Sequence, residues 1–400
     1  MRVRDDVVIL GAARTPIGRF LRSLSPLSAV ELGGVAIRAA VERSGIPPDV
    51  IDEVIMGQVV QAGSGMAPAR NAALKAGLPP SVGAVTLNKV CGSGLKAVMT
   101  AASFIQAGEG TIYVAGGMES MSRGPYLLPK ARTGYRMGHG EVVDATVHDG
   151  LWSAWEDVHM GMAAEWIAEH YHVSREAQDV FAFESHVRAL QAIREGRFRE
   201  EVVPVHVPQR KGPPVEVTQD ECPRPDTSLA KLAALPPAFK EGGTVTAGNA
   251  PPLSDGAAAV VVASGAAARS RGLVPLARIL GYAQAAVEPI ALFTAPIFAI
   301  RKLWRDMGWG PDDVDLYEIN EAFAAQMVAD LRELGLDERR VNVNGGAIAL
   351  GHPIGASGTR VLVTLLYALK QRGLRRGIAA LCLGEGEAVA MAVELVESSA

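Results

Sequence analysis

The chain has 400 residues, of which 48% are hydrophobic and 20% charged, with a formal net charge of -4 at pH 7. This composition is typical of a folded protein of two or three domains and excludes extensive disorder, and the small, mixed charge gives no footprint for nucleic acid. Three widely separated cysteines favour a reducing compartment over a disulfide framework. No signal peptide is visible and no apolar stretch is long enough to span a bilayer, so we expect a cytoplasmic protein without membrane insertion.

The N-terminal third alternates between short apolar runs and helical spacing. Residues 7–10 predict a buried strand, and residues 26–44 predict a helix that ends at Gly45, just before two prolines. Further strands are expected near residues 50–60 and 111–115. Strands that alternate with helices favour an α/β fold with a parallel or mixed sheet covered on both faces.

Cys91 lies where a predicted strand turns into a predicted helix. Residues 86–98 pass from an apolar run through Gly92 and Gly94 into a small-residue helical pattern. Glycines allow a tight bend and a close approach, and the N–H groups at a helix start favour a thiolate. We predict that Cys91 is a nucleophile with a lowered pKa; the alternative is a buried structural cysteine.

The texture of the sequence changes from about residue 121, where glycine, proline, arginine and aromatic residues become denser. Ser174 is the predicted N-cap of a helix that reaches about Gly196, and residues 204–237 are expected to be a loop. Residues 256–263 are small and β-branched and are expected to return to the first sheet. We therefore assign residues 121–248 to an inserted loop domain that covers a site.

The C-terminal part repeats the N-terminal part weakly but in the same order. The matched segments, at a nearly constant separation, are 48–54 with 311–317, 91–95 with 355–358, and 111–117 with 378–384. Such a pattern indicates duplication. It predicts two similar halves, residues 1–120 with 249–270 and residues 271–400, whose glycine turns meet near a shared pseudo-twofold axis.

The second glycine turn carries a histidine. His352 lies among five glycines within residues 342–358, where the backbone must bend around a ligand. Within reach of Cys91, it would act as a base in acyl transfer. Cys382 ends a predicted strand beside Gly384, whose amide could donate to an oxyanion, although taken alone such a cysteine is more often a core residue.

Two other site types are weighed against this interpretation. Residues 92–97 fit the glycine pattern of dinucleotide-binding turns, but the next strand ends in glycines without an acidic residue for a ribose. A zinc site of Cys91, His352 and Cys382 would lack any local pair with metal-ligand spacing. Cys222, in a proline-rich segment, is taken as incidental.

Several segments together resemble the thiolases, in order and over essentially the whole chain. They are residues 88–95, 117–122, 320–323, 351–358 and the strand ending at Cys382. Within that family the chain looks most like the bacterial acetyl-CoA acetyltransferases. The resemblance implies duplicated α/β halves with mixed five-stranded sheets in a layered α-β-α-β-α arrangement, together with an inserted loop domain.

The resemblance implies condensation of two acetyl-CoA molecules to acetoacetyl-CoA and CoA, or the reverse thiolysis, through an acyl-cysteine. Cys91 would attack the thioester with help from His352, and Cys382 would deprotonate the second acetyl-CoA. His352 and a water held by Asn320 would bind the enolate oxygen, while the amides of Cys91 and Gly384 would bind the acyl oxygen. CoA contacts are implied at His159, Met160, Arg224, Phe239, Ala247, Ala322 and Phe323.

Other implications concern partners. CoA thioesters would be substrates, no permanently bound cofactor or metal is implied, and a homodimer or homotetramer is expected, with a place in fatty-acid metabolism. Four residues depart from the family pattern: Glu385, Glu387, Pro251 and Phe293. They leave open a broader 3-ketoacyl-CoA thiolase of fatty-acid breakdown and a CoA-binding protein with impaired catalysis. The two carboxylates could raise the pKa of Cys382 or point elsewhere.

Overall fold

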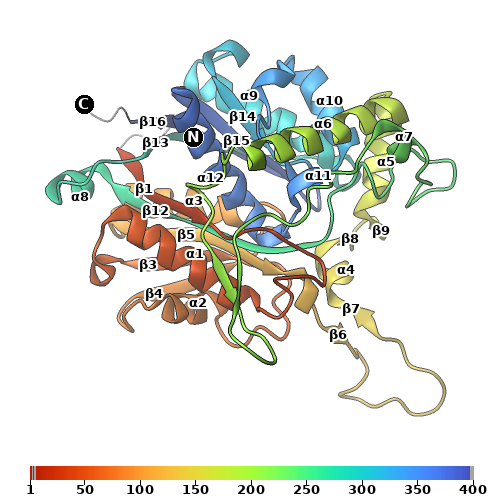
Figure 1. Ribbon diagram of the computed structural model, residues 1–400, viewed down its shortest axis with the longest axis horizontal. Helices are drawn as coiled ribbons and strands as arrows, with labels where there is room; N and C mark the ends of the chain where they lie inside the picture. The colour runs from red at the N-terminus through yellow and green to blue at the C-terminus, as the bar shows by residue number, and fades with distance from the viewer. Residues whose placement is uncertain (2, 4–5, 397–400) are drawn as a thin grey trace.

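One hydrogen-bonded sheet of ten strands runs through the molecule (Figure 1). The computed structural model describes residues 1, 3 and 6–396. Along the sheet the order is β14-β15-β16-β13-β1-β12-β5-β3-β4, with the short β2 paired to β12. The strands are β1 (Val7–Arg14), β2 (Gly18–Arg19), β3 (Glu53–Gly57), β4 (Gly83–Leu87), β5 (Ile112–Ser120), β12 (Ser254–Ser264), β13 (Ala277–Ala286), β14 (Leu316–Ile319), β15 (Arg376–Leu383) and β16 (Glu387–Leu395).

The sheet consists of two half-sheets with the same strand order. The series β13, β16, β15, β14 repeats β1, β12, β5, β3, and an antiparallel contact between β1 and β13 joins the halves. The first half has β4 as its fifth strand, whereas the second has only a bridge at Val341. There the side-chain amide of Asn342 bonds both backbone groups of Ile319, at 2.9 and 2.8 Å, and replaces further strand pairing.

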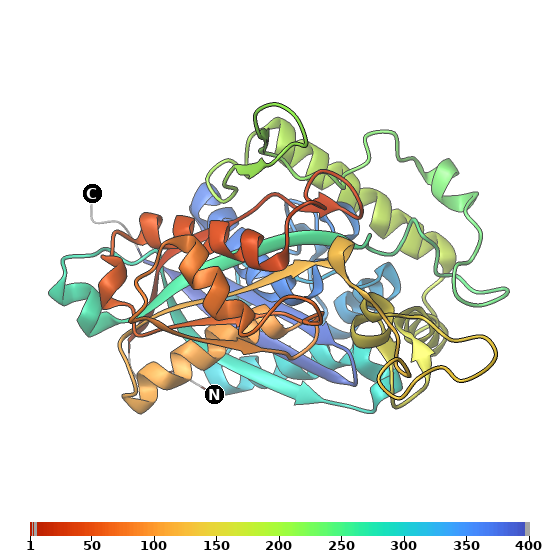
Figure 2. The same ribbon diagram turned by 90° about the horizontal axis from the view of Figure 1, so that it is seen from below.

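Helices cover both half-sheets and fill the space between them. Two central helices, α3 (Ser93–Ala107) and α12 (Ile354–Arg372), pack on each other and on strands of both halves. Outside lie α1 (Ala29–Ser44) and α2 (Pro68–Ala76) on the first half, and α9 (Ala295–Met307) and α10 (Ala324–Leu334) on the second. Figure 2 shows the same stacking from below. The result is an α-β-α-β-α arrangement.

Hydrophobic patterning explains these layers. Every residue of α12 from Ile354 to Leu369 is buried, because this helix lies between the two half-sheets. Outer helices bury only one face, as α1 does against β1, β5 and β12. Gly45 ends α1 in the left-handed conformation, as the sequence predicts, while Ser28 caps its start and forms a capping box with Glu31.

A long segment between β5 and β12 covers one end of the sheet, at the right of Figure 1. Its elements are β6 (Tyr126–Leu127), β7 (Val143–Asp144), α4 (Ala145–Gly150), β8 (Trp152–Ser153), β9 (Val158–His159), α5 (Met160–His170), α6 (Arg175–Arg194), β10 (Val205–Val207), β11 (Val215–Val217) and α7 (Leu229–Ala233). Ser174 caps α6, as predicted, and the strand after the segment returns to the first half-sheet. The expected loop at 204–237 contains a small hairpin and α7. The predicted domain boundaries stay a prediction.

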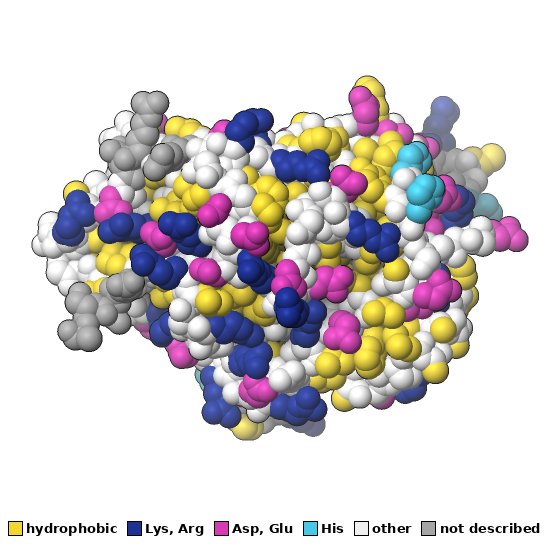
Figure 3. Space-filling model, turned by 90° about the horizontal axis from the view of Figure 1, so that it is seen from above, with side chains coloured by type: hydrophobic (Ala, Val, Ile, Leu, Met, Phe, Trp, Pro, Cys, Tyr) yellow, Lys and Arg dark blue, Asp and Glu magenta, His cyan; other side chains and the backbone are white. Residues whose placement is uncertain are grey.

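The remaining elements are short. They are α8 (Gly265–Ser270), α11 (Ala347–Leu350) and the 3-10 turns η1 (Pro48–Val50), η2 (Met121–Arg123), η3 (Pro289–Thr294), η4 (Pro311–Asp313) and η5 (Glu338–Arg340). On the face in Figure 3, basic and acidic side chains are interspersed. Among the described residues, no helix has both the length and the apolar character that a membrane crossing requires.

Candidate active site

The turn between β4 and α3 holds Cys91 by a dense set of local bonds. Ser93 Oγ accepts from the backbone N–H of Lys89 at 2.8 Å and donates to the carbonyl of Val90 at 2.6 Å. A Cβ on Gly92 would lie 2.7 Å from a side-chain carbon of Leu383 on β15, so only glycine fits there. The first glycine turn is thereby pressed against the strand that carries Cys382.

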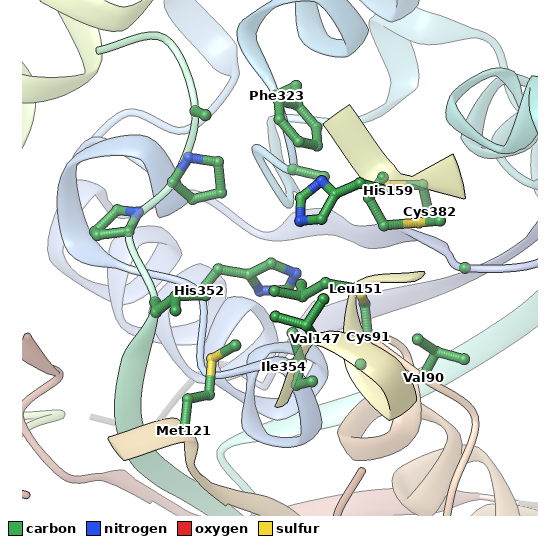
Figure 4. A pocket seen from close by; sticks show the side chains of 18 of the residues that line it. Val90, Cys91, Met121, Val147, Leu151, His159, Phe323, His352, Ile354 and Cys382 are labelled. Carbon is green, nitrogen blue, oxygen red and sulfur yellow. The ribbon is translucent and has the colours of Figure 1, made fainter. Parts of the chain in front are cut away.

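Cys91 opens onto a cavity of about 410 Å³ with mainly apolar walls. Segments far apart in the chain meet around it, and Figure 4 shows Cys91, His352 and Cys382 gathered there with His159. Eleven of the twelve residues proposed from the sequence line the cavity: Cys91, His159, Met160, Arg224, Phe239, Ala247, Ala322, Phe323, His352, Cys382 and Gly384. The twelfth, Asn320, lies beside it, with its Nδ2 3.5 Å from His352 Nε2.

The pKa of Cys91 is raised, not lowered, so that part of the sequence prediction is wrong. Hydrogen bonds from the backbone N–H groups of Gly384 and of Cys91 itself favour the thiolate, but burial outweighs them and raises the pKa of the thiol to about 12. Glu119 adds a smaller like-charge effect in the same direction. Cys91 is therefore a neutral thiol at pH 7 and needs a base.

His352 is buried, and its neighbours fix the orientation of its ring. The Ser357 hydroxyl donates to the Pro353 carbonyl at 3.0 Å, so its oxygen accepts the Nδ1 proton of His352 at 2.6 Å. This leaves Nε2 unprotonated, with the Nδ2 amide group of Asn320 3.5 Å away. Burial, and secondarily the positive charge of Arg360, lower the pKa of His352 to about 3, so the imidazole is neutral at pH 7.

Cys382 is buried at the end of β15. Burial raises the pKa of its thiol well above the usual value, with smaller contributions from Cys91 and from Asp330 on α10. The two carboxylates that follow it in the sequence point elsewhere: Glu385 bonds Ser153 and Ala154, and Glu387 forms an ion pair with Lys89. The sequence left open whether these carboxylates raise the pKa of Cys382 or point elsewhere, and in the structure they point elsewhere.

Aromatic rings form one wall of the cavity. His159 stacks on Phe239 with ring centroids 4.8 Å apart, and Phe323 meets both Phe239 and Phe293 edge to face, at 6.1 and 5.3 Å. Phe293 and Pro251, two of the departures from the family pattern, also line the cavity. Arg224 is partly exposed at the wall, where a cation could meet an anionic ligand group.

Sequence reasoning missed the residues that hold the site from behind. The buried carboxylate of Glu119 accepts the N–H groups of Val59, Val60 and Gly355, and so ties the start of α12 to the first half. Burial raises its pKa to about 7. Ser357 was visible within the glycine turn, but its contact with His352 had no signal in the sequence. Cys222 is buried, with its sulfur 3.8 Å from Ser254 Oγ, outside the cavity wall.

Across residues 1, 3 and 6–396, no group of three or more His, Cys, Asp or Glu side chains is arranged to hold a metal ion. The apolar lining and the thiol–imidazole set suit thioester chemistry.

Residues 7–266 match the description "Thiolase, N-terminal domain", and residues 273–395 match "Thiolase, C-terminal domain". The acetyl-CoA acetyltransferase of Cupriavidus necator is 54% identical over 97% of this chain and 99% of its own length, and that of Pseudomonas aeruginosa is 54% identical over 97% and 98%. The crystal structure of the Bacillus anthracis acetyl-CoA acetyltransferase has a TM-score of 0.96 at 44% identity and covers 99% of this chain and 100% of that one. Acat5 thiolase from Ascaris suum, in complex with coenzyme A, has a TM-score of 0.92 at 43% identity over 98% and 100%. This chain belongs to the thiolase family.

Proposed function

We propose that this protein is an acyltransferase that condenses two acetyl-CoA molecules to acetoacetyl-CoA and CoA, and catalyses the reverse thiolysis. The observation that carries the proposal is the convergence of Cys91, His352 and Cys382, from three distant segments, on one apolar cavity. Membership of the thiolase family and the names of the most similar relatives support it.

The first half-reaction transfers the acetyl group to Cys91. The Cys91 sulfur attacks the thioester carbonyl while its proton passes to His352 Nε2, and collapse of the tetrahedral intermediate expels the CoA thiolate, which takes the proton of the Cys382 thiol and leaves Cys382 as a thiolate. The backbone N–H groups of Cys91 and Gly384 are the donors for the developing oxyanion, since both already bond the sulfur.

The second half-reaction forms the carbon–carbon bond. The Cys382 thiolate left by the first half-reaction removes a proton from the methyl carbon of a second acetyl-CoA, and the resulting enolate carbon attacks the acetyl group on Cys91. The C–S bond to Cys91 then breaks, and the Cys91 thiolate takes its proton back from His352. The protonated Nε2 of His352 donates to the enolate oxygen, and Asn320 Oδ1, which is buried and has no hydrogen-bond partner among the described residues, would accept from a water that donates to the same oxygen.

Intact-mass spectrometry after mixing with acetyl-CoA tests these roles. Wild type and Cys382→Ala are expected to carry one acetyl group, on Cys91, but only wild type makes acetoacetyl-CoA. Cys91→Ala should remain unmodified, and Cys222→Ala should behave as wild type because Cys222 lies outside the cavity wall. No acetyl-enzyme in the wild type, or a label on Cys222, would reject the proposal.

Chain length is the open part of the substrate assignment. The ring of Phe293 occupies the wall next to Phe323 and belongs to the same apolar cluster as Cys382, which favours a short acyl group over the longer substrates of a broad 3-ketoacyl-CoA thiolase. Thiolysis rates for 3-ketoacyl-CoA substrates of increasing length would separate the two. Rates that rise with length would favour the broader enzyme.

The third candidate, a CoA-binding protein with impaired catalysis, loses its main support. It rests on Glu385, Glu387 and Pro251, but both carboxylates are engaged away from Cys382. CoA binding without acetyl exchange would revive it. The homodimer or homotetramer, the cytoplasmic location and a place in fatty-acid metabolism belong to the same proposal; sedimentation analysis tests the first.

A further inference from the structure

The turn between β15 and β16 carries a glutamate, Glu385, where the backbone favours glycine, and a second glutamate, Glu387, begins β16. The turn comprises residues 384–386, directly after the strand of Cys382. Glu385 has a φ of +63°, in the left-handed region that side chains with a Cβ rarely occupy. A residue that accepts this backbone strain is a candidate for a side-chain role.

On one side, Glu385 reaches the hairpin of β8 and β9. Its Oε2 accepts from the Ser153 hydroxyl at 3.0 Å, and its Oε1 accepts from the Ala154 N–H at 2.9 Å. Ser153 Oγ also accepts from the Glu156 N–H at 3.0 Å, which orders the hairpin turn itself. This hairpin leads directly into His159 and Met160, which line the cavity.

On the other side, Glu387 reaches the turn of the nucleophile. Lys89 Nζ lies 2.6 Å from both carboxylate oxygens of Glu387, and Lys89 precedes Cys91 by two residues. The pair is partly buried, with side-chain exposures of 19% for Lys89 and 37% for Glu387. Charge-assisted bonds of this geometry restrain two segments more firmly than neutral bonds do.

Gly384 is the first residue of this turn. Its N–H bonds the Cys91 sulfur, and its Cα faces Val90 and Met160, since a Cβ there would lie 3.2 and 3.9 Å from their side chains. Any tilt of the turn would therefore move the N–H donor relative to the sulfur. Oxyanion stabilisation depends steeply on such placement.

We propose that Glu385 and Glu387 form a two-sided clamp, built of positioning residues, that aims the Gly384 N–H at Cys91 and fixes the cavity wall at His159 and Met160. The inference rests on the proposed acyltransferase function. The clamp has two arms. The Glu387–Lys89 pair acts on formation of the acetyl-enzyme, and the Glu385–Ser153 contact acts on binding of the CoA thioester.

Charge exchange tests the Glu387 arm. Lys89→Glu and Glu387→Lys are each expected to slow acetylation of Cys91 by about fivefold or more, with KM for acetyl-CoA changed by less than about twofold, and the double exchange is expected to restore most of the rate. Glu200→Gln, which removes an exposed ion pair with Lys370, is the control for a lost charge and should leave the rate unchanged. Failure of the double exchange to restore the rate would overturn this arm.

Truncation tests the Glu385 arm. Glu385→Gly suits the backbone conformation, so it is expected to raise KM by about threefold or more with kcat nearly unchanged, and to speed hydrogen exchange at the Ala154 amide by about tenfold. Ser153→Ala should give a smaller effect in the same direction and add nothing to Glu385→Gly. Unchanged KM and exchange, or fully additive effects, would overturn it. If wild type itself forms no acetyl-enzyme, the proposed function fails; if wild type and all variants acetylate equally, only the clamp fails.

Discussion

At the residue scale, the protonation states of Cys91, His352 and Cys382 complement each other. Burial keeps Cys91 and Cys382 as thiols and His352 as a neutral imidazole. A resting ion pair between Cys91 and His352 is thereby disfavoured, and the proton moves only when a thioester is attacked. Such a site is protected from adventitious alkylation and depends on substrate binding to expel water and bring the reactants together.

Alkylation of Cys91 should follow the raised pKa of its thiol. Because the pKa lies near 12, the thiolate fraction grows about tenfold per pH unit across the range from about pH 7 to 9, and inactivation by iodoacetamide should rise with it. Stopped assays of residual activity, with peptide mass spectrometry to locate the label, measure this. Cys222 also has a pKa raised to about 12, but it is buried outside the cavity wall, whereas Cys91 is partly exposed to the cavity, so Cys222 should stay unlabelled. A plateau in the rate below about pH 8 would instead indicate a preformed thiolate.

The sequence identified the side chains that converge on the cavity but misjudged the ionisation of Cys91. Glycine-flanked turns identify Cys91 and His352 because few other roles need that local pattern. The pKa of Cys91 was predicted from the adjacent helix start alone, whereas the decisive factor is desolvation by residues contributed from both halves. Ser357 and Glu119 were missed for a related reason: each acts through one contact whose partner is set by tertiary packing.

At the scale of elements, a buried charge network attaches the segment between β5 and β12 to the sheet. Arg14 on β1 is fully buried. Its Nη1 and Nη2 donate to the two carboxylate oxygens of Asp220 at 2.7 and 2.8 Å, and its Nε donates to Glu201 at 2.7 Å. Asp220 Oδ1 also accepts the Ile17 N–H at 2.8 Å. The segment leading to Arg224 is therefore attached to the core by side chains that lie outside the cavity.

Breaking this network should destabilise the protein substantially. Asp220→Asn removes one of the two charges that neutralise buried Arg14, and the expected loss is about 3 kcal/mol of unfolding free energy, measured by urea denaturation. Asp226→Asn, in the same segment but in an exposed pair with Lys231, is the matched control and should show no loss beyond experimental error. Equal behaviour of the two variants would mean that the buried network does not anchor the segment.

Element prediction succeeded where local signals are strong and failed where contacts are distant. The predicted caps Gly45 and Ser174 mark helix ends through bonds within a few residues. The short strands of the covering segment pair over two or three residues, too few to leave an alternating pattern. The contacts of Glu385 and Glu387 join positions more than 200 residues apart, so their consequence could not be read from the sequence.

Duplication organises the whole molecule, because the two central helices begin beside each other at equivalent glycines. A Cβ on Gly358 would lie 2.3 Å from the Leu95 nitrogen, and a Cβ on Gly94 would lie 2.7 Å from the Thr359 nitrogen. Backbone therefore packs on backbone where α3 and α12 cross. This contact sets the spacing between the turn of Cys91 and the turn of His352, so the symmetry of the fold brings the nucleophile to its base.

Adding one methyl group at this crossing should disturb stability and chemistry together. Gly358→Ala forces the two helix starts apart, and we expect a loss of about 3 kcal/mol in unfolding free energy with a strong fall in the rate of acetyl-enzyme formation, measured on protein that is still folded. Gly83→Ala is the control, because its Cβ would meet only ordinary contacts at 3.6 Å or more. Gly94→Ala should act on the same contact, so the double variant should cost less than the sum of the single variants. If Gly358→Ala lost stability but formed acetyl-enzyme at the wild-type rate, the helix crossing would be a packing contact only. The hydrogen bonds of Glu119 and the turn at Gly384 would then have to set the spacing of Cys91 from His352.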